Sequence, residues 1–292
     1  MLKRIITGIV AILLFIPICV SSHFDGWNII FPIAISILSA VGVYEISKCL
    51  GHNKNFTLTF PMYFIALVFP MLRYILVSNR IFLAIAMLAV FGILIYYLVY
   101  SMIKNSIKIT DENENISYSY LSIKEVLTLF TLNIYVIGCF SSIYMLRTGK
   151  DGDYIYLLAF LGAWVCDTFA YFVGVLFGKH KLIPAISPKK TIEGSIGGIL
   201  FTIGAFALYT YIVNTFFGAS LNYIKLCVLG LVISIISQIG DLIASKLKRE
   251  YGIKDYGNIF PGHGGVMDRF DSLILTSAVF FIILALFGVV LC

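Results

Sequence analysis

Residues Ile81 to Ile103 read IFLAIAMLAVFGILIYYLVYSMI, a run of 23 residues without a charged side chain. About twenty apolar residues in a helix cross the roughly 30 Å hydrocarbon core of a bilayer. A helix also satisfies its backbone amides internally, which lipid cannot do for them. This run is therefore predicted to be a transmembrane helix.

The rest of the chain has the same character. Of its 292 residues, 60% are hydrophobic and 12% are charged, whereas soluble domains carry about 25% charged residues. Nine segments are long and apolar enough to span a bilayer: Ile5 to Ser21, Asn28 to Ile46, Leu58 to Val77, Ile81 to Ile103, Val126 to Met145, Tyr154 to Phe177, Gly194 to Phe216, Tyr223 to Ala244 and Ser272 to Cys292. We predict an all-α, polytopic integral membrane protein that forms a single membrane domain over residues 1–292.

Lysine and arginine are distributed unequally between alternating loops. With a cytoplasmic amino terminus, sixteen of the 21 basic residues lie on the cytoplasmic side, as the positive-inside rule favours. This orientation places two polar segments, Gly178 to Glu193 and Ser245 to Asp271, in the cytoplasm. The spans in residues 1–150 have no clear role, whereas residues 151–292 carry the candidate chemistry.

The first polar segment contains Ser187-Pro188-Lys189-Lys190-Thr191, directly before a predicted helix. Two ammonium groups between two hydroxyls, beside the free amides of a helix start, suit a polyphosphate. A basic loop that orients the protein, with Thr191 or a neighbour capping the helix, accounts for the same residues. These residues alone leave both interpretations open.

The second polar segment is rich in carboxylates. Asp241, Ser245 and Lys248 share one helical face if their helix continues past the membrane. Asp268 and Asp271 follow at the opening of the last helix. Carboxylates from two helix ends can hold Mg²⁺ against phosphate oxygens, and Asp241 and Asp268 are the candidate pair. Favourable placement of acids at a helix amino terminus is the alternative explanation of Asp268 and Asp271.

Three further residues have two interpretations each. His263 stands in a glycine turn, Gly262 to Gly265, and it is either a donor to phosphate or a simple polar contact. Arg269 binds an anion or pairs with a neighbouring aspartate. Asp167 lies inside a predicted span and near one helical face with Tyr171; it is a functional carboxylate or a buried structural hydrogen-bond partner.

A long stretch of this segment resembles the signature of the phosphatidate cytidylyltransferases: Ser245-x-Leu247-Lys248-Arg249-x4-Lys254-Asp255-x-Gly257-x2-Phe260-Pro261-x-His263-Gly264-Gly265-Val266-x-Asp268-Arg269-Phe270-Asp271. The resemblance continues upstream over Asp167-Thr168-Phe169-Ala170-Tyr171, Gly178-Lys179-His180-Lys181-Leu182 and Ser187-Pro188-Lys189-Lys190-Thr191-x-Glu193-Gly194. It covers about the carboxy-terminal half of the chain. So many fixed polar positions make it far more specific than a lone glycine motif.

The resemblance implies a polytopic helical enzyme that joins CTP to phosphatidic acid, giving CDP-diacylglycerol and pyrophosphate. It implies Mg²⁺, with a monovalent cation such as K⁺ as a further expectation, and a homodimer without nucleic-acid partners. We expect it in a bacterial inner membrane with its active site facing the cytoplasm.

The resemblance and the local patterns together give the expected site. Its catalytic residues are Asp241, Asp268, Lys248, Arg249, His263 and Arg269; its substrate-binding residues are Ser187, Lys189, Lys190, Thr191, Ser245, Lys254, Gly264, Gly265, Asp167 and Tyr171; its metal ligands are Asp241, Asp268 and Asp271. The alternatives are a CTP-dependent lipid-alcohol kinase, a cytidylyltransferase for another lipid phosphate and, from another class, an ion-coupled transporter using Asp167 and Asp241.

Overall fold

The computed structural model describes residues 10, 13, 15–21, 27–76, 79–103, 107–110, 116–119, 122–149, 152–260, 262 and 264–287. The helices in these ranges are α2 (Ile30–Cys49), α3 (Phe56–Ile75), α4 (Asn79–Ile103), α5 (Ile123–Arg147), α6 (Gly152–Phe177), α7 (Ile192–Phe217), α8 (Tyr223–Glu250) and α9 (Met267–Phe287). Within the described ranges, eight helices are long and apolar enough to cross a membrane. The all-α, polytopic membrane fold is thus confirmed.

The predicted spans and the observed helices agree from the second span onward. The first predicted span, Ile5 to Ser21, lies largely outside the described residues, so the count of nine stays a prediction. Two short antiparallel hairpins interrupt the helical order: β1 (Ile107–Thr110) pairs with β2 (Ile116–Ser119), and β3 (Lys181–Ile183) pairs with β4 (Ser187–Thr191).

The chain divides into two compact units, residues 14–138 and residues 1–13 with 139–292. A single domain over 1–292 stays a prediction. In the first of these units, α2 packs on α3 and α3 packs on α4. Its fully buried side chains include Phe31, Leu58, Met62 and Tyr97. The helices of this unit therefore pack large apolar side chains against one another.

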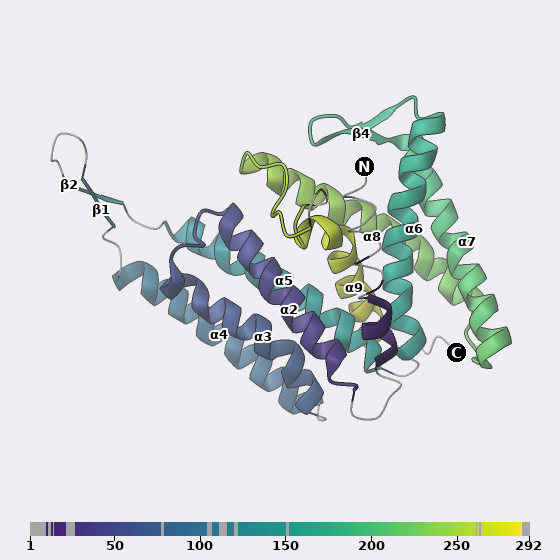
Figure 1. Cartoon of the computed structure of the whole chain (residues 1–292), viewed down its shortest axis with the longest axis horizontal. Helices are drawn as coiled ribbons and strands as arrows, with labels where there is room; N and C mark the ends of the chain where they lie inside the picture. Colours follow the sequence, from purple (N-terminus) through teal and green to yellow (C-terminus); the bar gives the residue numbers. More distant parts are fainter. Residues whose placement is uncertain are drawn as a thin grey trace. The chain divides into compact units, whose positions relative to one another are not determined.

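The unit that holds residues 139–292 is built around α6, which packs against α7, α8 and α9 (Figure 1). Glycines permit close approach here: a Cβ added to Gly162 of α6 would stand 2.5 Å from Cγ2 of Ile233 on α8. Figure 1 shows the β3–β4 hairpin beside the end of α6. The hairpin packs on α6 and α7 and reaches α8 through Lys190 and Asp241.

The length of α8 matters for the site. It has 28 residues, and at about 1.5 Å per residue it is longer than the hydrocarbon core is thick. Asp241, Ser245 and Lys248 therefore do lie on one continuous helix, as the spacing predicted.

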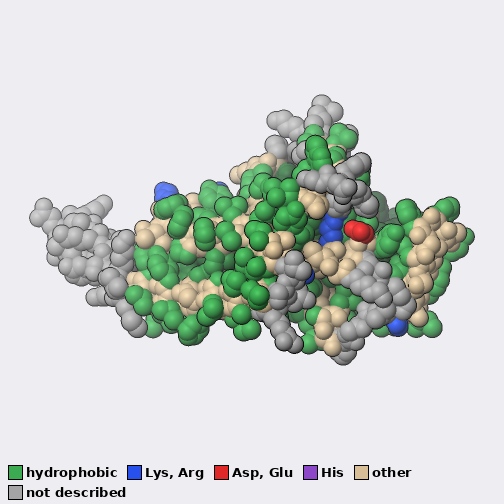
Figure 2. All heavy atoms as spheres, turned by 90° about the horizontal axis from the view of Figure 1, so that it is seen from below, with side chains coloured by type: hydrophobic (Ala, Val, Ile, Leu, Met, Phe, Trp, Pro, Cys, Tyr) green, Lys and Arg blue, Asp and Glu red, His purple; other side chains and the backbone are tan. Residues whose placement is uncertain are grey.

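The surface is apolar. Large hydrophobic side chains are strongly exposed, among them Leu88 (72%), Phe216 (74%) and Ile224 (77%). On the face drawn in Figure 2, hydrophobic side chains cover much of the described surface, and acidic side chains lie beside basic ones among them. Such exposure is unfavourable in water and suits contact with lipid.

Candidate active site

The β3–β4 hairpin presents the predicted basic motif. The motif residues Ser187 to Thr191 form the strand β4, whereas the sequence predicts a loop here. Side chains alternate along a strand, so Lys189 and Lys190 point to opposite faces. Lys189 is exposed, whereas Lys190 is partly covered and its Nζ lies 2.6 Å from Oδ2 of Asp241 on α8. The first polar segment therefore contacts α8 directly, four residues before the predicted start of the second polar segment.

Thr191 joins this hairpin to α7. It is the N-cap residue, and its Oγ1 accepts a hydrogen bond from the Gly194 amide at 3.1 Å. The predicted helix cap is thus confirmed. Thr191 is also buried, at 5% exposure. Direct binding of phosphate by Thr191 stays a prediction.

The cap rests on two glycines of the α6 end. A Cβ at Gly178 would stand 2.2 Å from the Gly174 carbonyl oxygen and 2.7 Å from Cγ2 of Thr191. The first of these contacts is with the backbone of α6, which cannot yield cheaply, and the second is with the hairpin, so a side chain at position 178 disturbs both the end of α6 and the hairpin that lies against it.

We expect Gly178→Ala to lower the free energy of unfolding by about 1–3 kcal/mol and to reduce turnover, because it displaces the strand that carries the lysines. Gly204→Ala on α7 is the matched control, since a Cβ there meets no atom within 4 Å. Thermal unfolding and turnover of both variants in the same detergent test this. If Gly178→Ala unfolded at the same temperature as the wild type, the expected clash would be contradicted.

A second anchor of the hairpin was not assigned from the sequence. The Glu193 carboxylate accepts from the His180 amide, with both oxygens at 3.2 Å, and its Oε1 lies 2.7 Å from His180 Nδ1. His180 precedes β3 and Glu193 stands in the first turn of α7. The pair closes the hairpin at its base. Both residues lie in the quoted motifs, yet nothing in their spacing of thirteen residues indicated that they touch.

Asp268 organises the loop between α8 and α9. Its Oδ1 lies 2.9 Å from Lys248 Nζ, and its Oδ2 accepts from the amides of Tyr256 at 2.8 Å and Gly265 at 2.9 Å. The Asp268 side chain is 3% exposed and that of Lys248 is 13% exposed. Gly264 has a φ of +86°, and a Cβ there would stand 2.8 Å from Oδ2 of Asp268. The loop thus wraps around a carboxylate whose two oxygens are both engaged.

Asp241 belongs to a second group of carboxylates. Besides Lys190, it accepts a hydrogen bond from Ser245 Oγ at 3.3 Å. Asp167 and Asp271 both interact electrostatically with Asp241 and with each other. We define Asp167, Asp241 and Asp271 as the carboxylate cluster; it joins α6, α8 and α9.

The carboxylate cluster does not form a complete protein cage for a metal. Among the residues that the structure describes, no three His, Cys, Asp or Glu side chains are arranged to hold an ion together. Magnesium usually binds through one or two carboxylates plus substrate phosphates and water, so it needs no such cage. Three neighbouring acids beside Lys190 fit that mode of binding. Metal binding by Asp241, Asp268 and Asp271 stays a prediction.

The other predicted residues surround this region unevenly. Arg249, Lys254 and Arg269 are exposed. Tyr171 is 63% exposed and its ring contacts Phe172, so the structure gives no contact between Tyr171 and the carboxylate cluster. His263 lies outside the described residues.

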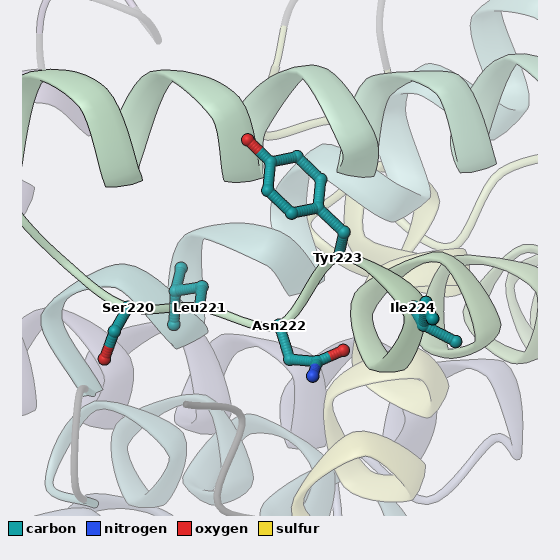
Figure 3. A pocket seen from close by; sticks show the side chains of 5 residues that line it. All are labelled: Ser220, Leu221, Asn222, Tyr223 and Ile224. Carbon is teal, nitrogen blue, oxygen red and sulfur yellow. The ribbon is translucent and has the colours of Figure 1, made fainter.

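A hollow lies far from this site. Ser220, Leu221, Asn222, Tyr223 and Ile224 line it at the loop between α7 and α8 (Figure 3). Asn222 caps α8 there by accepting from the Lys225 amide at 3.1 Å. Asp241 stands eighteen residues beyond Tyr223, the first residue of the same helix, or about 27 Å at 1.5 Å per residue. The hollow therefore does not belong to the charged site.

Comparisons with known proteins agree with the motifs. The model of the cytidylyltransferase family matches residues 2–287. The chain is 46% identical over 129 residues to the phosphatidate cytidylyltransferase of Staphylococcus haemolyticus, covering 44% of this chain and 48% of that protein. It is 40% identical over 156 residues to the phosphatidate cytidylyltransferase of Bacillus subtilis, covering 53% and 56%.

In these comparisons the chain spans about half the length of the curated relatives it matches. The family match, in contrast, extends over nearly the whole chain and includes the hairpin, the carboxylate cluster and the α8–α9 loop. This protein belongs to the cytidylyltransferase family.

Proposed function

We propose that this protein transfers the cytidylyl group of CTP to phosphatidic acid, forming CDP-diacylglycerol and pyrophosphate. One observation carries the proposal: the lysine-bearing hairpin meets the carboxylate cluster at Lys190 and Asp241, 2.6 Å apart. Lysines that can bind a polyphosphate therefore lie next to carboxylates that can bind its Mg²⁺ counter-ion. The apolar surface of the protein suits the acyl chains of a diacyl lipid.

The proposed reaction is an in-line displacement. An oxygen of the phosphatidic acid phosphate attacks the α-phosphorus of CTP, the bond between that phosphorus and the bridging oxygen breaks, and pyrophosphate leaves with the bonding electron pair. No covalent enzyme intermediate is needed, because phosphoryl-type transfer depends mainly on positioning and charge neutralisation.

The chain's own residues position the two substrates. Lys189 and Lys190 hold the triphosphate, and Ser187 supplies a hydroxyl beside them. Lys248, Arg249 or Arg269 meets the lipid phosphate. The exposed positions of Lys189, Arg249 and Arg269 support contact with charged groups in solution or at the headgroup layer.

Magnesium is the expected cofactor, held by Asp241 with Asp268 or Asp271. A bound Mg²⁺ would neutralise charge on the phosphates and on the departing pyrophosphate. Use of K⁺, the homodimer, and a bacterial inner membrane with a cytoplasmic active site belong to the same proposal.

Release of pyrophosphate tests the proposed reaction. Purified protein in detergent is given CTP and Mg²⁺, with phosphatidic acid, with diacylglycerol, or without lipid. Release that requires both phosphatidic acid and Mg²⁺ is expected. Formation of CDP with diacylglycerol would instead indicate the lipid-alcohol kinase, and ion flux without nucleotide dependence in vesicles would indicate the transporter.

A further inference from the structure

Ser272 lies where α6, α8 and α9 meet. It is 2% exposed, and its Oγ donates a hydrogen bond to Oδ2 of Asp167 at 2.8 Å. From α8, a Cβ added to Gly240 would stand 3.4 Å from the Ser272 Cα and 3.0 Å from the Asp271 carbonyl oxygen. Three helices are thus packed tightly around this one serine.

Ser272 binds two members of the carboxylate cluster at once. Its hydroxyl holds Asp167 on α6, and its backbone amide donates to Oδ1 of Asp271 on α9 at 2.9 Å. Both acids interact electrostatically with Asp241. Since the three carboxylates repel one another, fixed donors are needed to keep them close together.

Each of these contacts engages a single carboxylate oxygen. In Asp167 the hydroxyl meets Oδ2, and in Asp271 the amide meets Oδ1. One oxygen of each carboxylate is thereby held in a fixed position. Donors of this kind orient metal ligands, and their loss typically weakens metal binding by about 10–100-fold.

We infer that Ser272 is a positioning residue, whose hydroxyl fixes Asp167 beside the Asp271 that the backbone amide holds, so that the carboxylate cluster binds the divalent cation of the nucleotide site. This inference rests on the proposed function. It assigns a role to a residue that is neither charged nor accessible, and that acts through the acids rather than by touching substrate.

A matched control stands on the same helix. Ser277 is also buried, at 0% exposure, and it too makes an interhelical contact, with Ser142 Oγ at 3.1 Å. The described contacts of Ser277 include no carboxylate. Ser277→Ala therefore reports the cost of losing a buried serine hydroxyl in α9 alone.

The test measures Mn²⁺ binding to the full-length protein in detergent. Electron paramagnetic resonance reports the bound Mn²⁺, and no nucleotide is present. Ser272→Ala removes the hydroxyl that donates to Asp167 and keeps the amide that donates to Asp271; it is expected to raise the Kd for Mn²⁺ by about 10–100-fold, and Ser277→Ala to leave it unchanged. Ser272→Thr, which keeps the hydroxyl, is expected to restore binding to within a few-fold. The Mg²⁺ concentration for half-maximal pyrophosphate release should shift in the same order.

Wild-type Mn²⁺ affinity in Ser272→Ala, with a loss of thermal stability like that of Ser277→Ala, would reduce Ser272 to a helix-packing contact and overturn the inference. A wild type that binds no Mn²⁺ overturns it as well. A Ser272-dependent Mn²⁺ site in a protein that releases no pyrophosphate supports the inference while refuting the proposed reaction.

Discussion

Asp241→Asn is expected to lower kcat/KM for CTP by about 10²–10³-fold, the typical cost of removing one electrostatic group that acts on the transition state. Asp241 stands at the meeting point of the hairpin and the carboxylate cluster, through Lys190 at 2.6 Å. The amide keeps the size of the side chain and removes its charge. Because Asp241 is about a quarter exposed, the fold should tolerate this change with little loss of thermal stability.

Asp153→Asn is the control for that variant. Asp153 is a 59% exposed carboxylate in the first turn of α6, and it lies 3.9 Å from the buried Arg147, outside the carboxylate cluster. It should retain wild-type turnover. Full activity of Asp241→Asn at low Mg²⁺ would contradict the role of Asp241.

Asp268→Asn is expected to abolish turnover and to destabilise the protein, by about 3–5 kcal/mol if it behaves as other broken buried ion pairs. The carboxylate of Asp268 meets Lys248 and two amides while only 3% exposed. An asparagine has one acceptor oxygen where the carboxylate has two, so its NH2 group faces either the Lys248 ammonium or the two amides, and those donors lose their acceptor.

Comparison of the two variants separates their roles. The unfolding temperature should fall sharply for Asp268→Asn and remain near that of the wild type for Asp241→Asn, although both variants lose activity. A stable, inactive Asp268→Asn protein would mean that the α8–α9 loop does not depend on this carboxylate, and it would favour a purely metal-binding role.

Much of the fold was predictable because lipid imposes a simple rule on sequence. Spans of about twenty apolar residues stand out, and those from Asn28 onward coincide closely with helices. The largest shifts are at the end of α8, which reaches Glu250 rather than Ala244, and at the start of α9, which begins at Met267 rather than at the predicted Ser272. The charges of Asp268, Arg269 and Asp271 lower the local hydrophobicity, so hydrophobicity alone could not extend the helix over them.

The sequence motifs suggested candidate residues for the site, but they did not indicate which of these residues pair. The motifs marked Lys190, Asp241, Lys248 and Asp268, yet the ion pairs between them join residues 51 and 20 positions apart. Such contacts depend on how the helices pack. The β3–β4 strands were missed for a local reason, since Ser187 to Thr191 contain lysines and a proline, which are uncommon in strands.

The most direct test of the proposed reaction follows the phosphates of CTP. Protein in phosphatidic acid vesicles with Mg²⁺ is given CTP labelled either in its α-phosphate or in its γ-phosphate, and the lipid is extracted. Cytidylyl transfer predicts that the α-label enters the lipid, while the γ-label appears only in pyrophosphate. Lipid that carries the γ-label, or no label from either CTP in a well-folded preparation, would contradict it.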